Sequence, residues 1–273
     1  MNANQMPTLK SWIVHRERTG RPCFSSRDVA EAYPSRSPNA VHAALSHFCA
    51  TGLLQRVHRG FFCVVPARYA LRGRIPADYY IGPLMQWLGK PYYVAALSAA
   101  AHWGAAHQKV MVTQVMTELP HSSTSGHRNP DIFWLYRKRV PKAFLVRENG
   151  ENGPLLYSNP VLTALDLVRW AGCSGGISFV ASVLDGLRDA IDFSGAADGV
   201  FRFVPVPDIQ RLGYLFDVVL EDASRAGAIF GELRRLGVFL RPVLLSPGAD
   251  SPVSGTNPRW KIRVNAAIDW EEA

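Results

Sequence analysis

A change of hydrophobic period within the first 65 residues constrains the fold of this chain more than any other feature. Over 9–18, and again from Pro38 to a helix end at Gly52, apolar side chains recur at the spacing of helices. Beyond Gly52 the spacing becomes that of strands, over 53–57 and 61–65, with a short turn between the two runs. The pattern predicts helices followed by a β-hairpin.

Capping residues delimit the second and third of these helices. Ser25 followed by Asp28 resembles a capping box and predicts a short helix that ends at Ala32. Ser37 as N-cap, with Pro38 at the first helical position, predicts the next helix. Three helices followed by a hairpin, with a short turn between the second and third helices, is the order of a winged helix-turn-helix.

Charge divides the chain in the same way. Residues 1–90 carry 12 Lys and Arg against 4 Asp and Glu, whereas residues 151–273 carry 11 against 15, and the whole chain has a formal charge of +8. A basic first third joined to a mildly acidic last part favours a nucleic-acid-binding module with a second activity attached to it. Two alternatives stay open, namely a basic surface without a partner and a winged helix that docks to protein.

The expected DNA contacts lie on two elements. Rotating by 100° per residue away from Val41 and Leu45 points Asn39 and Ser46 towards a major groove and places His42 on the flank of that face, within reach of base edges or phosphates. Arginines around the hairpin turn and at the start of the second helix are suited to backbone phosphates, and Arg72 and Arg74 in the following segment add non-specific attraction. The candidate DNA contacts are Arg27, Ser37, Asn39, His42, Ser46, Arg56, His58 and Arg59.

The remainder of the chain predicts a mixed domain. Residues 66–90 are expected to link it to the first module. Helices are expected over 92–106, 158–170, 177–191, 209–219 and 229–236, and strands over 110–119, 132–137, 155–157 and 259–264. We therefore expect an α+β protein with a DNA-binding domain over 1–72 and a mixed α/β domain over 73–273.

Several catalytic motifs are absent from the sequence. No acidic residue stands two positions before any of the six lysines, as restriction-type nucleases require, and the only acids one residue apart are Asp269 and Glu271. The letters of a nucleophile elbow occur at 172–176, but they follow a predicted helix and no histidine comes after His127. We expect no enzyme activity, no cofactor and no metal.

The cysteines and the hydropathy pattern indicate the compartment. None of the four cysteines forms a CxxC pair, so we expect reduced core residues. No apolar run reaches the roughly 18 residues that a membrane span needs, and no signal-peptide core is evident at the N-terminus. The expectation is a soluble cytoplasmic protein.

One polar constellation lies in the last third. Gln210, Tyr214 and Asp217 fall on one face of a predicted helix, and Arg211 lies beside them. We treat these four residues as a candidate partner surface. An interhelical polar network, or an exposed helix flank, is the alternative reading of the same spacing.

A set of short segments occurs along the chain in a fixed order. The segments are Tyr92-Tyr93-Val94, 97–100, 104–108, Ser158-Asn159-Pro160, 163–167, Gly175-Gly176, 210–215, Arg259-Trp260 and Asn265. The ordered set resembles the AbiEi family, the antitoxins of AbiE-type (type IV, abortive-infection) bacterial toxin–antitoxin systems. Two positions depart from the family pattern, because Trp103 stands where histidine is expected and Val161 where glutamate is expected.

The resemblance implies a winged helix-turn-helix that represses the system's own promoter. It also implies a C-terminal domain that counters a nucleotidyltransferase-like toxin, with no stable complex required. We therefore expect a DNA-binding autorepressor and antitoxin whose operator contains inverted repeats. Two rivals are a winged-helix transcription factor that senses a small ligand and a divergent nuclease.

Overall fold

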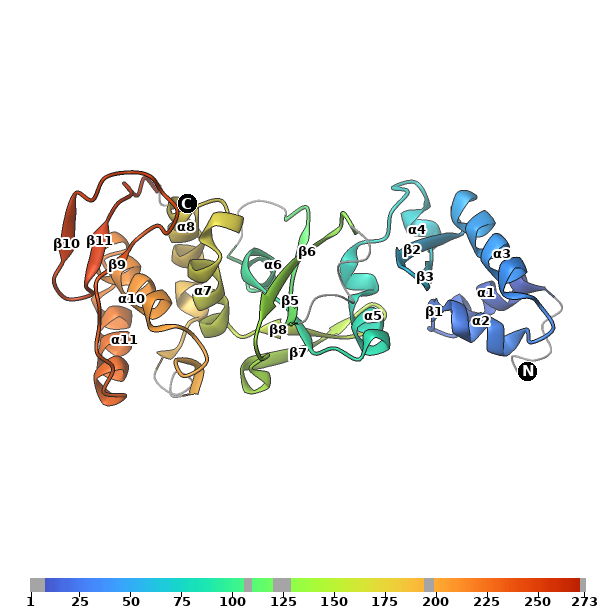
Figure 1. Ribbon diagram of the computed structural model, residues 1–273, viewed down its shortest axis with the longest axis horizontal. Helices are drawn as coiled ribbons and strands as arrows, with labels where there is room; N and C mark the ends of the chain where they lie inside the picture. The colour runs from blue at the N-terminus through green and yellow to red at the C-terminus, as the bar shows by residue number, and fades with distance from the viewer. Residues whose placement is uncertain (1–7, 106–109, 120–128, 194–198, 271–273) are drawn as a thin grey trace. The chain divides into compact units, whose positions relative to one another are not determined.

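The fold is taken from a computed structural model, which describes residues 8–105, 110–119, 129–193 and 199–270. The chain divides into two compact units, coloured by residue number in Figure 1. The first consists of Met1–Tyr92, Val115–Val140 and Arg147–Leu156, and the second of Tyr93–Gln114, Pro141–Val146 and Tyr157–Ala273. The fold class is mixed α+β, with helices and three sheets, as the sequence predicts.

The first unit begins with the three helices and the hairpin that the period change predicts. We call residues 8–65 the N-terminal module. Its sheet also includes a strand that the sequence analysis did not predict, and the strand order is β1-β3-β2 with both pairs antiparallel. The elements are α1 (Leu9–Arg18), β1 (Cys23–Ser25), α2 (Ser26–Ala32), α3 (Pro38–Ala50), β2 (Leu54–His58) and β3 (Phe61–Val64).

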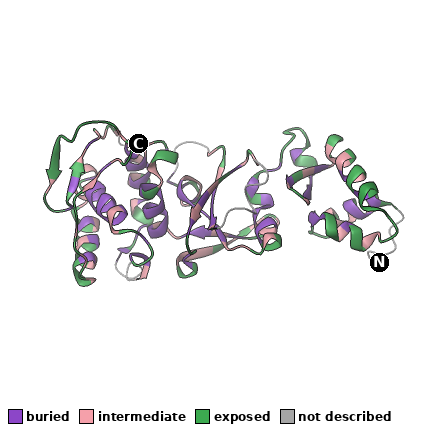
Figure 2. Ribbon diagram, in the orientation of Figure 1, coloured by how far each residue is buried: buried purple, intermediate pink, exposed green. Residues whose placement is uncertain are grey.

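Side-chain caps begin each helix of the module. Ser25 and Asp28 form the predicted capping box, in which Asp28 accepts a hydrogen bond from the Ser25 backbone N–H at 2.6 Å. The Ser37 hydroxyl accepts from the Ala40 N–H, and Pro38 occupies the first helical position, as predicted. The module has one hydrophobic core, and Figure 2 colours its buried positions purple on the ribbon. The core includes Leu9, Trp12, Ile13, Phe24, Val29, Val41, Leu45, Leu54, Phe62 and Val64.

The segment expected to be a link is folded. It contains α4 (Ala67–Ala70), the 3₁₀ turn η2 (Ala77–Tyr79) and α5 (Ile81–Leu88). Tyr80 and Ile81 are fully buried, so this stretch contributes core to the first unit. The prolines and arginines of this segment indicated a linker, and its apolar side chains were therefore not predicted to be part of a core.

A five-stranded sheet has the order β6-β5-β4-β8-β7, and β4 runs parallel to β8 with Val94 opposite Tyr157. The predicted helix over 92–106 is wrong in its first part, because Tyr92, Tyr93 and Val94 form a strand and helix α6 (Ala96–His102) begins only after it. Aromatic and β-branched residues favour strands, and all three are buried. The strands are β4 (Tyr92–Val94), β5 (Thr113–Glu118), β6 (Ile132–Arg137), β7 (Leu145–Gly150) and β8 (Gly153–Ser158).

Helices dominate the second unit. Asn159 caps α7 by accepting a hydrogen bond from the Leu162 N–H at 2.9 Å, and α7 packs against α6, α8 and α10. A turn of π-helix, η6, follows α10. The elements are α7 (Pro160–Arg169), α8 (Ile177–Leu187), α10 (Val206–Tyr214), η6 (Leu215–Val219), α11 (Ala223–Arg235), β9 (Val243–Leu244), β10 (Gly255–Asn257) and β11 (Ile262–Val264), with short 3₁₀ turns at Lys142–Phe144, Ala171–Cys173 and Arg188–Ala190.

The strand expected over 259–264 is shorter than its alternation suggests. Lys261 has a φ of 54°, which interrupts extended backbone before β11 begins at Ile262. Trp260 nevertheless points inward and is fully buried. The apolar positions of the alternating pattern therefore predicted burial correctly for Trp260, although this residue lies in a turn rather than in a strand.

Candidate nucleic-acid interface

Helix α3 presents a polar face opposite its buried stripe. Val41 and Leu45 are buried in the module core, whereas Asn39 and His42 are exposed, as the helical rotation predicts. Ser46 is half-buried and accepts a hydrogen bond from the Arg56 guanidinium at 3.3 Å. The exposed face therefore combines small side chains with an amide and an imidazole.

The hairpin supplies two exposed arginines from different places. Arg56 lies on β2, with its guanidinium 5.5 Å from the centre of the Phe62 ring. Arg59 lies in the turn, beside Gly60, whose φ of 78° allows the tight reversal. His58 differs from both, because its half-buried ring lies 5.6 Å from the ring of Trp87 in α5. Trp87 also stacks on Phe61, which holds the turn against α5.

The remaining candidates surround the start of α2 and α3. Arg27 is exposed on α2 and forms an ion pair with Glu31 at 2.8 Å, so part of its charge is neutralised locally. Ser37 is exposed, but its hydroxyl already caps α3. The sequence analysis missed Arg36, an exposed cation that lies over the Tyr33 ring immediately before Ser37. Its position one residue before an N-cap was the signal that could have found it.

Arg16 differs from these exposed arginines because it is partly buried. The Arg16 guanidinium donates to the carbonyl oxygens of Arg21 and Cys23 and packs on Trp12. Burial lowers the pKa of Arg16 from its ordinary value, in spite of the opposing charge of Asp28. Arg16 therefore stabilises the module from within.

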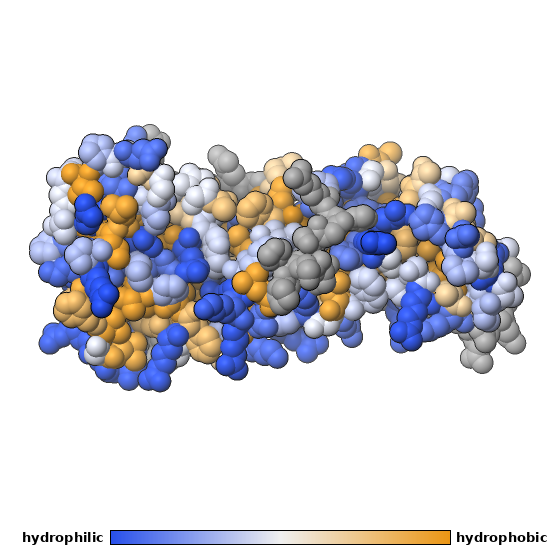
Figure 3. All heavy atoms as spheres, viewed as in Figure 1, coloured by the Kyte–Doolittle hydropathy of each residue, from blue (hydrophilic) through white to orange (hydrophobic). Residues whose placement is uncertain are grey.

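The visible face of the module carries hydrophilic side chains among paler ones (Figure 3).

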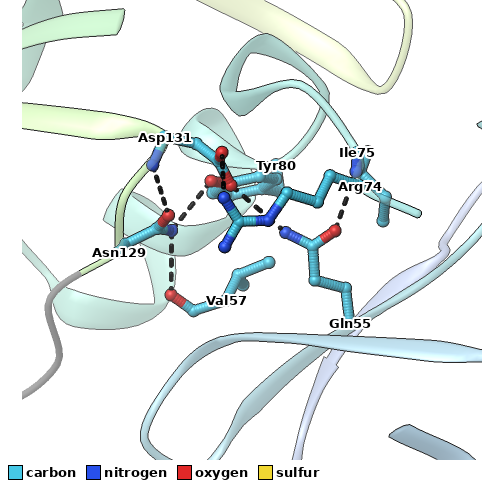
Figure 4. A network of polar contacts seen from close by, with 7 residues as sticks. All are labelled: Gln55, Val57, Arg74, Ile75, Tyr80, Asn129 and Asp131. Carbon is cyan, nitrogen blue, oxygen red and sulfur yellow. Dashed lines mark hydrogen bonds and ion pairs between the residues drawn. The ribbon is translucent and has the colours of Figure 1, made fainter. Parts of the chain in front are cut away.

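A polar clamp, formed by Gln55, Arg74, Asn129 and Asp131, fixes β2 within the first unit (Figure 4). Gln55 accepts from the Ile75 N–H at 2.7 Å, and Arg74 pairs with Asp131 at 3.3 Å. The clamp borders a pocket of about 350 Å³ that Arg56 and Arg74 also line. Arg74, expected as a free basic residue of a linker, thus helps to hold the hairpin in place.

Within the polar clamp, the Asn129 side chain connects two separate segments of the chain. Its amide donates to the Val57 carbonyl at 3.2 Å and to the Tyr80 hydroxyl at 2.8 Å. Burial raises the pKa of Tyr80 far above its ordinary value, which keeps the phenol neutral. A half-buried amide bonded to both a strand and a helix-bearing segment leaves β2 little freedom to shift its register.

The candidate partner surface of the second unit lies in the interior. Gln210 is 1% exposed and donates to the carbonyl oxygens of Arg241 and Trp260, at 2.9 and 2.7 Å. Arg211, 9% exposed, donates to Asp208 and to a backbone carbonyl, and burial lowers its pKa. This arrangement is an internal polar network, as in the first alternative that the sequence left open, although its partners outside α10 lie in a turn, a loop and strand β9 rather than in a second helix.

Tyr214 and Asp217, the other two residues of the candidate partner surface, also face the interior of the second unit. Tyr214 is buried, and burial raises its pKa above the ordinary value. Asp217 accepts a hydrogen bond from the Trp260 indole at 2.8 Å and pairs with Arg259 at 2.9 Å. The four residues therefore lie close together, as their spacing predicts, but they face the protein rather than solvent.

A second buried network joins β4, β8 and the helices of the second unit. Tyr93 donates to the fully buried Asp166 at 2.8 Å, and the hydroxyls of Ser158 and Thr163 lie 2.7 Å apart. Trp103, one of the two departures from the AbiEi pattern, donates its indole N–H to the Ser158 carbonyl at 2.9 Å.

The other departure, Val161, is 3% exposed and packs as an apolar residue. Of the resembling segment 104–108, residues 106–108 lie outside the described part of the chain. At 172–176, Ser174 is buried after a 3₁₀ turn, and no strand leads into it, so the requirements of a nucleophile elbow are not met.

Across the described ranges, no group of three His, Cys, Asp or Glu side chains is arranged to hold a metal ion. Within the same ranges, no helix is both long enough and apolar enough to cross a membrane.

This chain is similar to a known protein family and to a solved structure. Residues 93–218 match the AbiEi antitoxin C-terminal domain. The crystal structure of the RV2827C protein from Mycobacterium tuberculosis is similar over 95% of this chain and 92% of that one, with a TM-score of 0.67 and 16% identity. At that identity the likeness shows a shared fold alone. No curated protein matches the chain.

Fold and site together define a two-unit α+β protein in which a basic helical module precedes a helix-rich unit that contains buried polar networks. The resemblance to the AbiEi antitoxin family noted in the sequence is confirmed over residues 93–218, which match the C-terminal domain of that family.

Proposed function

We propose that this chain is a DNA-binding transcriptional autorepressor and the antitoxin of a type IV, AbiE-like toxin–antitoxin system. The observation that carries the DNA-binding half is the exposed face of α3, where Asn39 lies opposite buried Val41 and Leu45 and exposed His42 lies on the flank. The AbiEi domain over 93–218 carries the antitoxin half. DNA binding is assigned to residues 1–72 and antitoxin activity to residues 73–273.

The N-terminal module acts as a winged helix-turn-helix in this proposal. Its element order α1-β1-α2-α3-β2-β3 and its sheet order β1-β3-β2 support that assignment. Helix α3 is the recognition helix, because its exposed face is narrow enough to enter a major groove. The β2–β3 hairpin is the wing, and α5 and the polar clamp support it.

Each candidate residue has a distinct role. Asn39 pairs with a base edge, since an Asn amide matches the donor and acceptor of adenine, and His42 and Ser46 contact bases or phosphates beside it. Arg56, Arg59 and His58 contact backbone phosphates from the wing, and Arg27 does so from α2, with Ser37 at the positive end of α3. Ser46 already accepts a hydrogen bond from Arg56, and its hydroxyl hydrogen is still available to donate to DNA.

The operator is the system's own promoter, read as inverted repeats by two copies of the chain. Inverted half-sites mirror a two-fold axis between two recognition helices, which sets their spacing near one helical turn of DNA. The cognate toxin is nucleotidyltransferase-like, and the antitoxin opposes its effect without catalysing a reaction itself and without requiring a stable complex.

Salt titration of DNA binding tests the first half. We expect a labelled duplex from the chain's own promoter to bind the full-length protein, with an affinity that falls as salt rises because phosphate contacts release counterions. Arg59→Ala lowers the slope of log affinity against log salt by about one unit. Arg234→Ala, at an exposed arginine of α11, is the matched control. Equal slopes for Arg59→Ala and the wild type would refute the wing assignment, and absence of binding would refute the DNA-binding half.

Growth rescue tests the second half with the same full-length variants. Expressed from an unrelated promoter beside the cognate toxin, both the wild type and an Asn39→Ala/Arg59→Ala double variant restore growth. The double variant fails to repress a reporter that carries the native promoter. If the wild type leaves the toxin's effect unchanged, the antitoxin assignment is wrong, and if the double variant also loses rescue, the two activities are not separable as proposed.

A further inference from the structure

Two cysteines face each other across the sheet of the N-terminal module. Cys23 lies on β1 and Cys63 on β3, and they are direct register partners in the antiparallel pair. Their sulfur atoms are 2.9 Å apart. Both side chains are buried, with Cys23 8% exposed and Cys63 fully covered.

This placement meets the backbone requirement of a disulfide without any rearrangement. Directly opposed residues of an antiparallel pair have Cα atoms about 4.5–5.5 Å apart. A disulfide requires about 4.4–6.8 Å between its Cα atoms. Closing the bond therefore needs only a small rotation of two side chains whose sulfurs already touch.

The two sulfurs differ in their access to solvent and in their environment. Cys23 is the more exposed of the pair, and its sulfur accepts a hydrogen bond from the Asn152 amide at 3.4 Å. Burial, together with its contact to Cys23, raises the pKa of Cys63 well above the ordinary value. Cys23 is therefore the sulfur that a small oxidant meets first, and Cys63 is placed to react with the product.

We propose that Cys23 and Cys63 are an oxidisable pair that a hydroperoxide converts into a cross-strand disulfide. The Cys23 sulfur attacks the peroxide, which is reduced to water or an alcohol, and becomes a sulfenic acid. The Cys63 sulfur then attacks the sulfenic sulfur, the S–S bond forms, and water leaves. Two thiols and one peroxide thus give one disulfide, and a thiol reductant reverses the change by exchange.

The bond would close a loop that contains the candidate recognition helix. The chain from Cys23 to Cys63 includes α2, α3 and β2, so an oxidised module cannot separate β1 from β3 when it opens. Constraining the unfolded chain stabilises the folded module. The inference rests on the paired strands alone and holds whether or not the module binds DNA.

The remaining cysteines provide internal controls. Cys49 is half-buried on α3, and Cys173 is exposed in the second unit, contrary to the expectation of a core residue. A full-length Cys49→Ser/Cys173→Ser variant keeps only the opposed pair. Cys63→Ala in that background removes the resolving thiol with little change of volume, and its folding is checked by circular dichroism.

Peroxide titration followed by denaturing alkylation and peptide mass spectrometry tests the proposal. We expect the double variant to lose both alkylatable thiols together, to yield a Cys23–Cys63 linked peptide, and to recover both thiols with dithiothreitol. The midpoint of thermal unfolding should rise by about 5 °C or more on oxidation. The Cys63→Ala chain should instead accumulate a sulfenic acid at Cys23, trapped by dimedone.

Two results would overturn the proposal. Both thiols could stay alkylatable after peroxide treatment that modifies Cys173 in the wild type, or the linked product could join Cys23 or Cys63 to a second chain. If Cys63→Ala does not fold, the linked peptide and the thermal shift in the double variant still decide between these results and the expected one.

Discussion

Helices α3 and α10 both carry polar residues beside apolar ones, and the two halves of the molecule use them in opposite ways. Asn39 and His42 of α3 face solvent. Gln210 and Arg211 of α10 are buried and bonded to backbone carbonyls. The same pattern in the sequence thus marks an available surface in one region and an internal scaffold in the other.

The difference follows from the cost of burying polar groups. A buried amide or guanidinium must replace its lost hydration with protein partners, so its removal leaves those partners unsatisfied. An exposed polar group stays hydrated without protein partners, so it is available to bind another molecule. We therefore expect substitutions in the second unit to act on stability, and substitutions on α3 to act on binding.

The contact between Gly213 and Trp260 gives the largest expected effect. A Cβ at Gly213 would lie 2.1 Å from the fully buried Trp260 ring, which has no space to retreat into. Gly213→Ala should lower the free energy of unfolding by about 3 kcal/mol, measured by denaturant titration.

Gly227→Ala on α11 is the control, because its Cβ meets nothing within 4 Å and alanine favours helices, so stability should hold or rise slightly. Equal effects of the two substitutions would mean that the indole does not pack on α10.

Gln210 tests the buried network itself. Gln210→Met keeps the length of the side chain but removes the donor that serves the carbonyls of Arg241 and Trp260. Leaving these groups unsatisfied should cost about 2 kcal/mol of unfolding free energy. Gln86→Met, at an exposed position of α5, should cost almost nothing. If both variants unfold at the wild-type denaturant midpoint, the interior network contributes nothing to stability.

Local signals explain which parts of the fold the sequence could predict. The capping residues Ser25, Asp28 and Ser37 act within four residues of chain, so the starts of α2 and α3 could be placed to the residue. Strand β7 was missed because it alternates partly exposed and exposed residues, including Arg147 and Glu148, which resembles a polar loop.

The candidate site could be predicted only as far as helical periodicity reaches. Periodicity shows that Gln210 and Tyr214 share a face, but not what covers it. The covering group is Trp260, which lies 50 residues away along the chain from Gln210 in a turn that the sequence presented as a strand. Arg36 and the polar clamp were missed for the same reason, since their partners come from separate segments.

Asp222 sharpens the comparison through its pH dependence. Burial tends to raise the pKa of Asp222, but hydrogen bonds from the Arg225 backbone and guanidinium outweigh it and hold the pKa below the ordinary value. A lowered folded-state pKa stabilises the protein above the unfolded-state value and loses that contribution as pH falls through the folded-state value.

Asp222→Asn should therefore cost about 1 kcal/mol at pH 7, because an uncharged amide caps α11 without the ion pair. Thermal melts from pH 7 to pH 2 should show the gap between variant and wild type closing in acid. A gap that persists unchanged at pH 2 would assign the loss to packing rather than to charge.

The exposed face of α3 should show the smallest effect on stability and the largest on binding. Asn39→Ala and His42→Ala remove side chains for which the fold has no structural use, so the free energy of unfolding should change by less than about 0.5 kcal/mol. Asn39→Ala should weaken binding to the operator by about 1–3 kcal/mol while affinity for unrelated duplexes stays level, since a base contact carries specificity. Anisotropy titrations with both duplexes, beside denaturant curves for the same preparations, measure the two quantities together. A variant that unfolds early, or that loses affinity for every duplex alike, would mean that α3 stabilises the module in the way that α10 stabilises the second unit, and that the groove-reading face lies elsewhere.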